Sequence, residues 1–189
     1  MANIDQAFGL RPIAKVGSAP GGTTGTTKYS IASGASGIFT GDPVKQANDG
    51  TVVVATAGDA IRGVFMGCFY TDPTTQKPTF SNHYPGGIAA SDITAFVVDD
   101  PDAVFLVDAD EAFTRADLFR NYSVTNTTGV TATGISKAQL DVSVSGTAQT
   151  FVIQAIDISQ DPDNSDTSTS NANVLVRINN HFYRSGTGL

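Results

Sequence analysis

The sequence predicts an all-β fold, either a β-barrel or a β-sandwich, with one short helix. The chain of 189 residues has 19 Gly and only 15% charged residues, and much of the remainder is Thr, Ser and Asn. Thr suits half-buried pleated surfaces, whereas Gly and Asn end strands at turns. Short apolar runs alternate with polar residues, and turn signals separate them. The length fits one domain.

The first 28 residues are predicted to form an extended N-terminal arm and linker. They mix polar residues with Phe8, Leu10 and Ile13, and a stretch rich in Gly, Ser and Thr follows. Such a composition is typical of a flexible linker. A terminal arm without a core of its own is ordered only where something ties it down. Residues 29–189 are then expected to form a single β domain.

The best organised block lies between residues 29 and 70. We expect its first strand to open at Tyr29. Three more strands follow, separated by turns at Gly41-Asp-Pro43, Asn48-Asp-Gly50 and Ala57-Gly-Asp59, of which the second is a strong hairpin signal. Strands joined in this way predict a meander that curls into a small barrel.

Residues 71–92 are predicted to be a long loop with little regular structure. They contain Pro73, Pro78, Pro85 and two adjacent glycines. A loop of this length inside a compact domain is unusual, and it is often functional or ordered by a partner.

Two strands, at 93–98 and 103–107, are expected on either side of a turn at Asp99-Asp-Pro-Asp102. The helix is predicted within residues 108–120, where Thr114 and Asp117 have the spacing of a weak capping box.

Three further strands are predicted at 136–144, 149–158 and 173–182. In the last of them Val174, Val176 and Ile178 lie on one face, whereas Leu175 and Arg177 lie on the other. This alternation is typical of a half-buried strand.

The net charge of −7 argues against a nucleic-acid-binding protein, because Lys and Arg are needed to displace counterions from phosphates. It argues equally against binding to anionic membranes. No apolar run has the length of a membrane span, and the N-terminus lacks the features of a signal peptide. We therefore expect a protein made in a cytoplasm that binds neither nucleic acid nor membrane.

No catalytic, cofactor or metal site is predicted. Cys68 lies in an apolar run and is expected to be buried, and His83 and His181 lack a second ligand at metal spacing. The loop 157–166 is rich in oxygen ligands but misses the spacing of a helix–loop–helix calcium site, so a turn is expected and cation binding stays open. The acidic run at 99–111 flanks turns and a helix start, where carboxylates accept backbone hydrogen bonds.

Three parts of the chain carry a resemblance. They are the opening Met1-Ala-Asn-Ile-Asp-Gln-Ala-Phe-Gly-Leu-Arg-Pro-Ile13; the block Phe39-Thr-Gly-Asp-Pro-Val44 with Ala55-Thr-Ala-Gly58 and Ile61-Arg-Gly-Val64; and the ending Asp161-Pro-Asp-Asn164, Asn171-Ala-Asn-Val174 and Ile178-Asn-Asn-His181. Together they resemble the capsid cement, or head decoration, proteins of tailed bacteriophages. Residues 71–150 take no part in the resemblance.

The resemblance implies a structural, non-enzymatic protein on the outer surface of the virion capsid. Its partner would be the major capsid protein of an icosahedral shell, whose subunit contacts it stabilises. The resemblance also implies a homo-oligomer, with a trimer favoured and a dimer as the alternative. The candidate shell contacts are Phe8, Leu10, Arg11 and Ile13 in the arm and Tyr84 in the 71–92 loop.

Two other functions are weighed against this one. The first is a head-fibre or carbohydrate-binding β module for host-surface attachment. Sugar sites usually present aromatic platforms, and although Trp is absent, Tyr70, Tyr84 and Tyr183 lie near predicted loops. The second is an enzyme, such as a hydrolase, that uses the carboxylates of Asp108 and Asp110.

Overall fold

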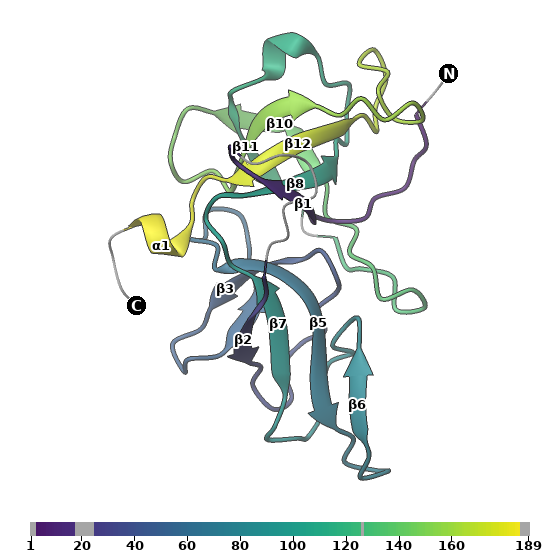
Figure 1. Ribbon diagram of the computed structural model, residues 1–189, viewed down its shortest axis with the longest axis vertical. Coiled ribbons are helices and arrows are strands. Elements are labelled where there is room, and N and C mark those ends of the chain that lie inside the picture. The colour runs from purple at the N-terminus through teal and green to yellow at the C-terminus, as the bar shows by residue number, and fades with distance from the viewer. Residues whose placement is uncertain (1–2, 18–24, 126, 186–189) are drawn as a thin grey trace.

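The computed structural model describes residues 3–17, 25–125 and 127–185. It confirms the all-β prediction, because the described residues form two antiparallel sheets in a sandwich-like arrangement and no closed barrel. Figure 1 shows one sheet in the upper half and the other in the lower half of an elongated molecule. The α-helix is a single turn, α1, at Phe182–Ser185.

The first sheet has the order β1-β8-β12-β11-β9-β10. Its strands are β1 (Arg11–Lys15), β8 (Ala103–Asp108), β9 (Asn121–Val124), β10 (Leu140–Gly146), β11 (Ile153–Ile158) and β12 (Asn173–Ile178). The predicted alternation in β12 is confirmed, since Val174, Val176 and Ile178 are buried and Leu175 and Arg177 are half-buried.

The second sheet has the order β2-β7-β5-β3-β4, and β6 pairs with β5 beside β3. Its strands are β2 (Thr27–Ser30), β3 (Pro43–Gln46), β4 (Val52–Val54), β5 (Gly63–Thr71), β6 (Pro78–Ser81) and β7 (Thr94–Val98). The hairpin at Asn48-Asp-Gly50 is confirmed, because Gly50 has a φ of 81° and Asp49 accepts a hydrogen bond from the Thr51 N–H at 3.0 Å. The predicted meander is wrong, since β5 pairs with β3 and not with β4.

Two hydrophobic clusters fill the interior. The larger one lies against the first sheet and includes Phe105, Phe113 and Tyr122, whereas the smaller one lies against the second sheet and includes Phe65 and Tyr84. β5 and β7 serve both clusters: Val64 and Val98 belong to the larger, and Phe65 and Val97 to the smaller. These two strands therefore connect the cores.

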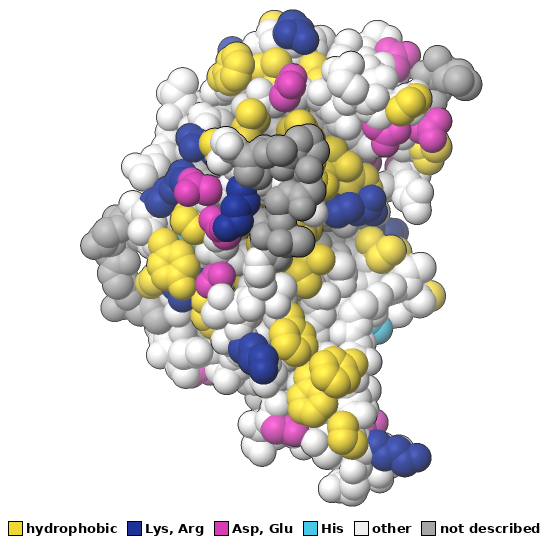
Figure 2. Space-filling model, in the orientation of Figure 1, with side chains coloured by type: hydrophobic (Ala, Val, Ile, Leu, Met, Phe, Trp, Pro, Cys, Tyr) yellow, Lys and Arg dark blue, Asp and Glu magenta, His cyan; other side chains and the backbone are white. Residues whose placement is uncertain are grey.

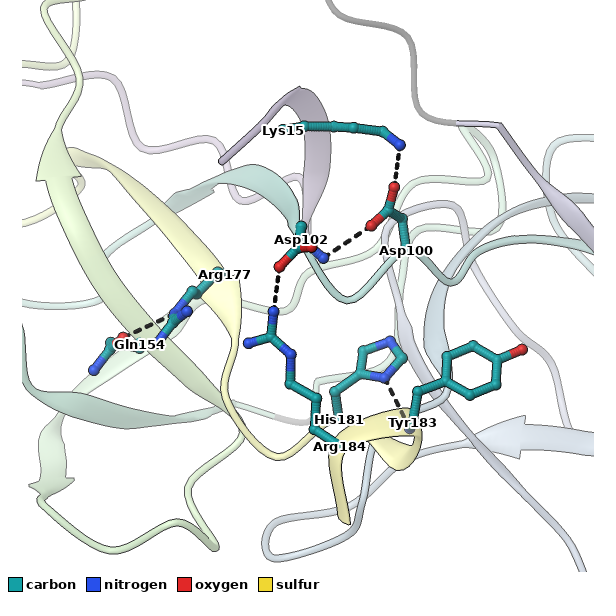
Figure 3. Close-up of polar contacts among 8 residues, drawn as sticks. All are labelled: Lys15, Asp100, Asp102, Gln154, Arg177, His181, Tyr183 and Arg184. Atoms are coloured by element: carbon teal, nitrogen blue, oxygen red, sulfur yellow. Dashed lines mark hydrogen bonds and ion pairs between the residues drawn. The ribbon is translucent and has the colours of Figure 1, made fainter. Parts of the chain in front are cut away.

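The turn at residues 99–102 carries the chain from one sheet to the other. The predicted strands before and after it are confirmed, but β7 belongs to the second sheet and β8 to the first. The carboxylates behave as predicted for turn residues, since Asp100 accepts the Asp102 N–H at 2.9 Å. Ion pairs with Lys15 and Arg184 attach β1 and α1 to the same turn (Figure 3).

The prediction of a helix within residues 108–120 is wrong. β8 continues to Asp108, and only Arg115–Asp117 form a turn of 3₁₀-helix. The capping spacing is confirmed, because the Thr114 N–H donates to the Asp117 carboxylate at 3.0 Å. The helix cannot continue because Phe119 has a φ of 67° and its N–H donates to the Ala155 carbonyl, which returns the chain to the sheet.

Two expected irregular segments contain strands. In the 71–92 loop, Pro78–Ser81 form β6 and pair with the second half of β5. In the N-terminal arm, Arg11–Lys15 form β1 and pair with β8, so this part of the arm belongs to the domain. Residues 1–2 and 18–24 of the expected arm and linker lie outside the described residues.

Two glycines position the N-terminal segment, residues 3–17. The Leu10 N–H donates to the Gly41 carbonyl at 2.9 Å, and Leu10 itself is 1% exposed in the larger cluster. Gly9 has a φ of 71°, and a Cβ at this position would lie 2.6 Å from the Gly41 oxygen and 2.7 Å from the Ser136 Cβ. The backbones at Gly9 and Gly41 therefore approach as closely as only glycines permit.

The C-terminal segment, residues 180–183, lies between the two sheets. Ile61, which precedes β5, donates its N–H to the Asn180 carbonyl and accepts from the Phe182 N–H, both at 2.8 Å. His181 between them is 1% exposed. Burial lowers the pKa of His181 to about 4, so its imidazole is neutral at pH 7.

The Gly9 contact predicts a large effect from one methyl group. Gly9→Ala should lower the free energy of unfolding by about 3–5 kcal/mol, because a left-handed backbone and a backbone collision add up. Gly58→Ala is the matched control, since Gly58 has a φ of 87° but open space around it, and it should cost about 1 kcal/mol. Urea denaturation measures both, and equal losses would contradict the close approach.

The burial of His181 predicts a contribution to stability that is lost in acid. The folded-state pKa is about 4 and the ordinary value 6.5, so the contribution is fully present above pH 6.5 and disappears as the pH falls towards 4. The stability advantage of the wild type over His181→Gln should shrink by about 3 kcal/mol between pH 7.5 and 4. Thermal denaturation at several pH values measures it. The control is His83→Gln, which replaces a half-buried histidine just after β6. A stability advantage over His181→Gln that does not change with pH would contradict the lowered pKa of His181.

Candidate interaction surface

The loop 161–171 holds the beginning of the N-terminal segment. The Asn3 Nδ2 donates to the carbonyls of Asp166 and Ser170, both at 2.8 Å, and the Asp166 N–H donates to the Asn3 Oδ1 at 3.0 Å. Buried Asn164 binds the next residue from both sides, since it accepts the Ile4 N–H at 3.3 Å and donates to the Ile4 carbonyl at 2.9 Å. We call this set of hydrogen bonds the asparagine clasp.

Exposed Arg11 packs on half-buried Phe8 in the segment. The Arg11 guanidinium lies 4.5 Å from the centre of the Phe8 ring, which is a cation–π distance. Both side chains line a hollow of about 440 Å³, together with Asp5 and Lys137. The sequence-predicted candidates Phe8 and Arg11 are thus brought together, with a cation and an apolar ring offered side by side.

Ile13 is exposed because β1 carries a bulge. Pro12 pairs with Phe105 and Ala14 with Val104, so Ile13 between them has no partner in the ladder. Its side chain is 37% exposed. Bulges re-aim side chains at sheet edges, and β1 is the edge strand of the first sheet.

An apolar hollow of about 430 Å³ lies beyond the end of β1. It is lined by the exposed side chains of Val16 and Phe119 and by half-buried Ile156 and Leu175, among others. Phe119 is 75% exposed and has a φ of 67°. A bulky residue in the left-handed region is strained, so the surrounding structure holds this ring in the solvent at a cost.

The other two predicted contacts are buried. Leu10 is 1% exposed, and Tyr84, in the smaller cluster, is 0% exposed. The Tyr84 hydroxyl accepts the Ile88 N–H at 3.2 Å, and its backbone forms a bridge with Ile38. The side chains of Leu10 and Tyr84 therefore serve the core of this chain and do not reach its surface.

A row of aromatic side chains crosses the outer face of the second sheet. Phe80 on β6 lies opposite Phe69 on β5, with ring centres 4.8 Å apart, and Phe96 on β7 follows at 6.3 Å from Phe80. Phe80 is 75% exposed. Figure 2 shows hydrophobic side chains gathered over these strands in the lower part of the molecule. This aromatic row is a second apolar surface.

A polar cluster around Arg62 joins the two sheets. The Arg62 guanidinium donates to the hydroxyls of Tyr29 at 2.7 Å and Tyr183 at 2.5 Å. Both hydroxyls donate to Asp99, at 2.6 and 3.2 Å. Arg62 is 9% exposed and stacks against the two tyrosine rings, so its charge is compensated through the phenols. Figure 3 shows Tyr183 and the neighbouring His181 at the C-terminal turn beside Asp100 and Asp102.

The groups considered for chemistry have structural contacts. Asp108 is 0% exposed, and the Asp110 carboxylate accepts the Val142 N–H at 3.0 Å. Burial raises the pKa of Cys68 to about 11, so the thiol stays protonated at pH 7. In the described part of the chain, no three His, Cys, Asp or Glu side chains lie close enough to hold a metal ion. No helix there is long and apolar enough to span a membrane.

Sequence reasoning missed the aromatic row, Phe119 and the Arg62 cluster. The aromatic row depends on the register in which β6 pairs with β5, and no strand was predicted at the position of β6. The Arg62 cluster contains residues from four segments that are distant in the sequence, so no local pattern predicts it. No local pattern predicts that Phe119 is exposed, because it is an apolar residue at the end of a segment that was expected to form a helix.

No protein-family model matches the chain, and no curated protein or solved structure matches it at a significant level. A function is therefore inferred from the residues of the chain itself.

Proposed function

We propose that the protein is a capsid cement protein that binds the outer surface of an icosahedral bacteriophage head. Its partner is the major capsid protein, whose subunit contacts it stabilises. The proposed shell contacts are exposed Arg11 and Ile13 and half-buried Phe8 of the N-terminal segment.

The observation that carries the proposal is that the three resembling parts of the chain contact one another. Asn164 of the C-terminal part binds the backbone of Ile4 in the opening part. Gly41 of the central block receives Leu10, and Ile61 of the same block bonds to the C-terminal part at Asn180. Three segments that are far apart in the sequence thus form one connected unit of the fold. This supports treating the resemblance as that of a fold unit rather than of scattered motifs.

The chemistry of the segment suits a protein surface. Arg11 over Phe8 offers a cation with apolar backing, and Arg and aromatic residues are the groups that most often dominate interface energies. Ile13 adds an apolar contact from a strand held rigidly by β8. Each contact is modest, but copies linked in an oligomer would gain strength by multivalency.

The aromatic row favours a second candidate function. Exposed Phe80, with Phe69 and Phe96 behind it, resembles the flat aromatic platform of carbohydrate sites, as expected for a head-fibre or host-attachment module. A glycan array separates the two functions, because binding that is lost in Phe80→Ser would favour the second.

Point variants test the proposed contacts better than truncation, because deleting residues 2–14 would also remove β1 and Leu10 from the domain. We expect the double variant Arg11→Glu, Ile13→Asp to fold but to occupy purified phage heads at least tenfold less, a loss of about 1.4 kcal/mol or more. Both side chains are exposed, so the melting temperature should change little.

Lys77→Glu is the control and should bind like the wild type, because it repeats the charge reversal of Arg11→Glu at an exposed residue between β5 and β6. Occupancy is measured by co-sedimentation with heads lacking the protein. Full occupancy by the double variant would remove these residues from the interface. Failure of the wild type to bind heads at near-stoichiometric ratio to the major capsid protein would reject the proposed function.

A further inference from the structure

Two polar side chains, Asp108 and Asn173, are buried beneath the N-terminal segment. They lie directly opposite each other in the β8–β12 ladder and are 0% and 4% exposed. Their neighbours Val107 and Val174 belong to the larger hydrophobic cluster, and successive side chains of a strand point to opposite faces. Asp108 and Asn173 therefore point away from that cluster, towards the face on which the segment lies.

The segment reaches the pair from two sides. Asn173 lines a hollow of about 200 Å³ together with Ile4 and Gln6. Gln139, which binds Asp108, lines the neighbouring hollow together with Asp5 and Gln6. Residues 4–6 therefore lie over the pair, and the asparagine clasp holds them there.

The hydrogen-bonding groups of Asp108 and Asn173 are only partly satisfied. The Asp108 Oδ2 accepts from the Gln139 Nε2 at 3.0 Å, and the Asn173 Nδ2 donates to the Asp161 Oδ2 at 3.2 Å. The remaining Asp108 oxygen, Oδ1, and the amide oxygen of Asn173, Oδ1, are both buried and receive no hydrogen bond from any described residue. Each unpaired buried acceptor is costly.

The backbone brings the two side chains close. The Asn173 N–H donates to the Asn164 carbonyl at 2.9 Å, and its carbonyl accepts the Ser159 N–H at 2.8 Å. Since neither group is directed at β8, Asp108 and Asn173 form a non-hydrogen-bonded pair, the type in which opposite side chains are nearest. A proton on the Asp108 Oδ1 would turn one acceptor into a donor and satisfy both oxygens at once.

We propose that Asp108 is protonated in the folded protein and donates a hydrogen bond to the Asn173 Oδ1, and that this acid–amide pair is a pH-sensitive latch for the N-terminal segment. Loss of the proton leaves two unpaired acceptors and a buried charge beneath the segment. The latch then loosens residues 3–10 without unfolding the sheet. This inference goes beyond the proposed function and does not depend on it.

Two neighbouring carboxylates, those of Asp5 and Asp110, favour the protonated form of Asp108. Asp5 faces it from the segment and Asp110 from the chain after β8, whereas Asp161 contacts Asn173, and Asp163, Arg11 and Lys137 line the adjoining hollows. Burial first, and then Asp5 and Asp110, raise the pKa of Asp108 to about 6. The folded value lies above the ordinary one of 3.8. The stabilisation is therefore complete below pH 3.8 and is lost as the pH rises through 6.

Asp108→Asn provides the test, because its amide can donate to Asn173 and accept from Gln139 at any pH. Relative to the wild type, the melting temperature of Asp108→Asn should rise by roughly 4–8 °C between pH 4.5 and 7.5. Asp163→Asn removes the same charge from an exposed loop residue and should show no such trend.

Hydrogen exchange reports on the segment itself. In the wild type, protection of the Ile4 and Leu10 amides, corrected for intrinsic exchange, should fall at least threefold from pH 5 to 7.5. In Asp108→Asn it should stay constant, as should that of the Ala47 amide in the distant hairpin in both proteins. Constant protection in the wild type would overturn the latch.

The carboxyl carbon of Asp108, followed by NMR in the wild type, needs no variant to fold. A titration near pH 6 supports the proposal, and one below pH 4 overturns it. Addition of Ca²⁺ at pH 7.5 distinguishes a cation from a proton. A melting temperature that rises with Ca²⁺ in the wild type but not in Asp108→Asn would assign the paired oxygens to a metal ion and reject the latch.

Discussion

The contact on which the structure depends is the docking of the C-terminal segment between the two sheets. Each sheet has a hydrophobic cluster of its own. β5 and β7 contribute to both clusters, and residues 180–183 form backbone hydrogen bonds with Ile61 just before β5. Arg62 is the centre of this junction. Its buried charge is offset by the hydroxyls of Tyr29 and Tyr183, which pass the hydrogen bonds on to Asp99. A buried ion is costly unless its donors are satisfied, so removing one phenol would leave part of that cost uncompensated.

The N-terminal segment is held by a different kind of force. Its second part, Arg11–Lys15, pairs with β8 as β1. Residues 3–10, apart from the side chain of Leu10, are held by the hydrogen bonds of the asparagine clasp and by the backbone approach at Gly41. Such bonds specify geometry well but contribute only about 1 kcal/mol each to stability. Residues 3–10 are therefore precisely placed yet weakly fixed, and a change of charge beneath them can shift them without disturbing the sheet.

The features that depend on neighbouring residues were predicted correctly from the sequence. The Asn48-Asp-Gly50 hairpin, the alternation in β12 and the Thr114–Asp117 capping contact follow from neighbouring residues, and all three are confirmed. The pairings of β5 with β3 and of β1 with β8 join distant segments, so no local pattern announces them. The candidate contacts were predicted only in part for the same reason. The sequence of an apolar arm is the same whether its own domain or a partner buries the side chains. Leu10 went to the core, while Ile13 was exposed by a bulge that depends on β8.

Burial acts in opposite directions on His181 in the junction and on Asp108 in the first sheet. It lowers the pKa of His181, a base, to about 4 and raises that of Asp108, an acid, to about 6. Between these values a fall in pH weakens the junction, whereas a protonated Asp108 strengthens the hold on the N-terminal segment. The two contributions offset each other in the free energy of unfolding of the whole chain. As the pH changes within this range, the balance between junction and segment shifts. The two contributions are therefore separated by comparing each single variant with the wild type, or by following single residues, and not by the pH profile of the wild type alone.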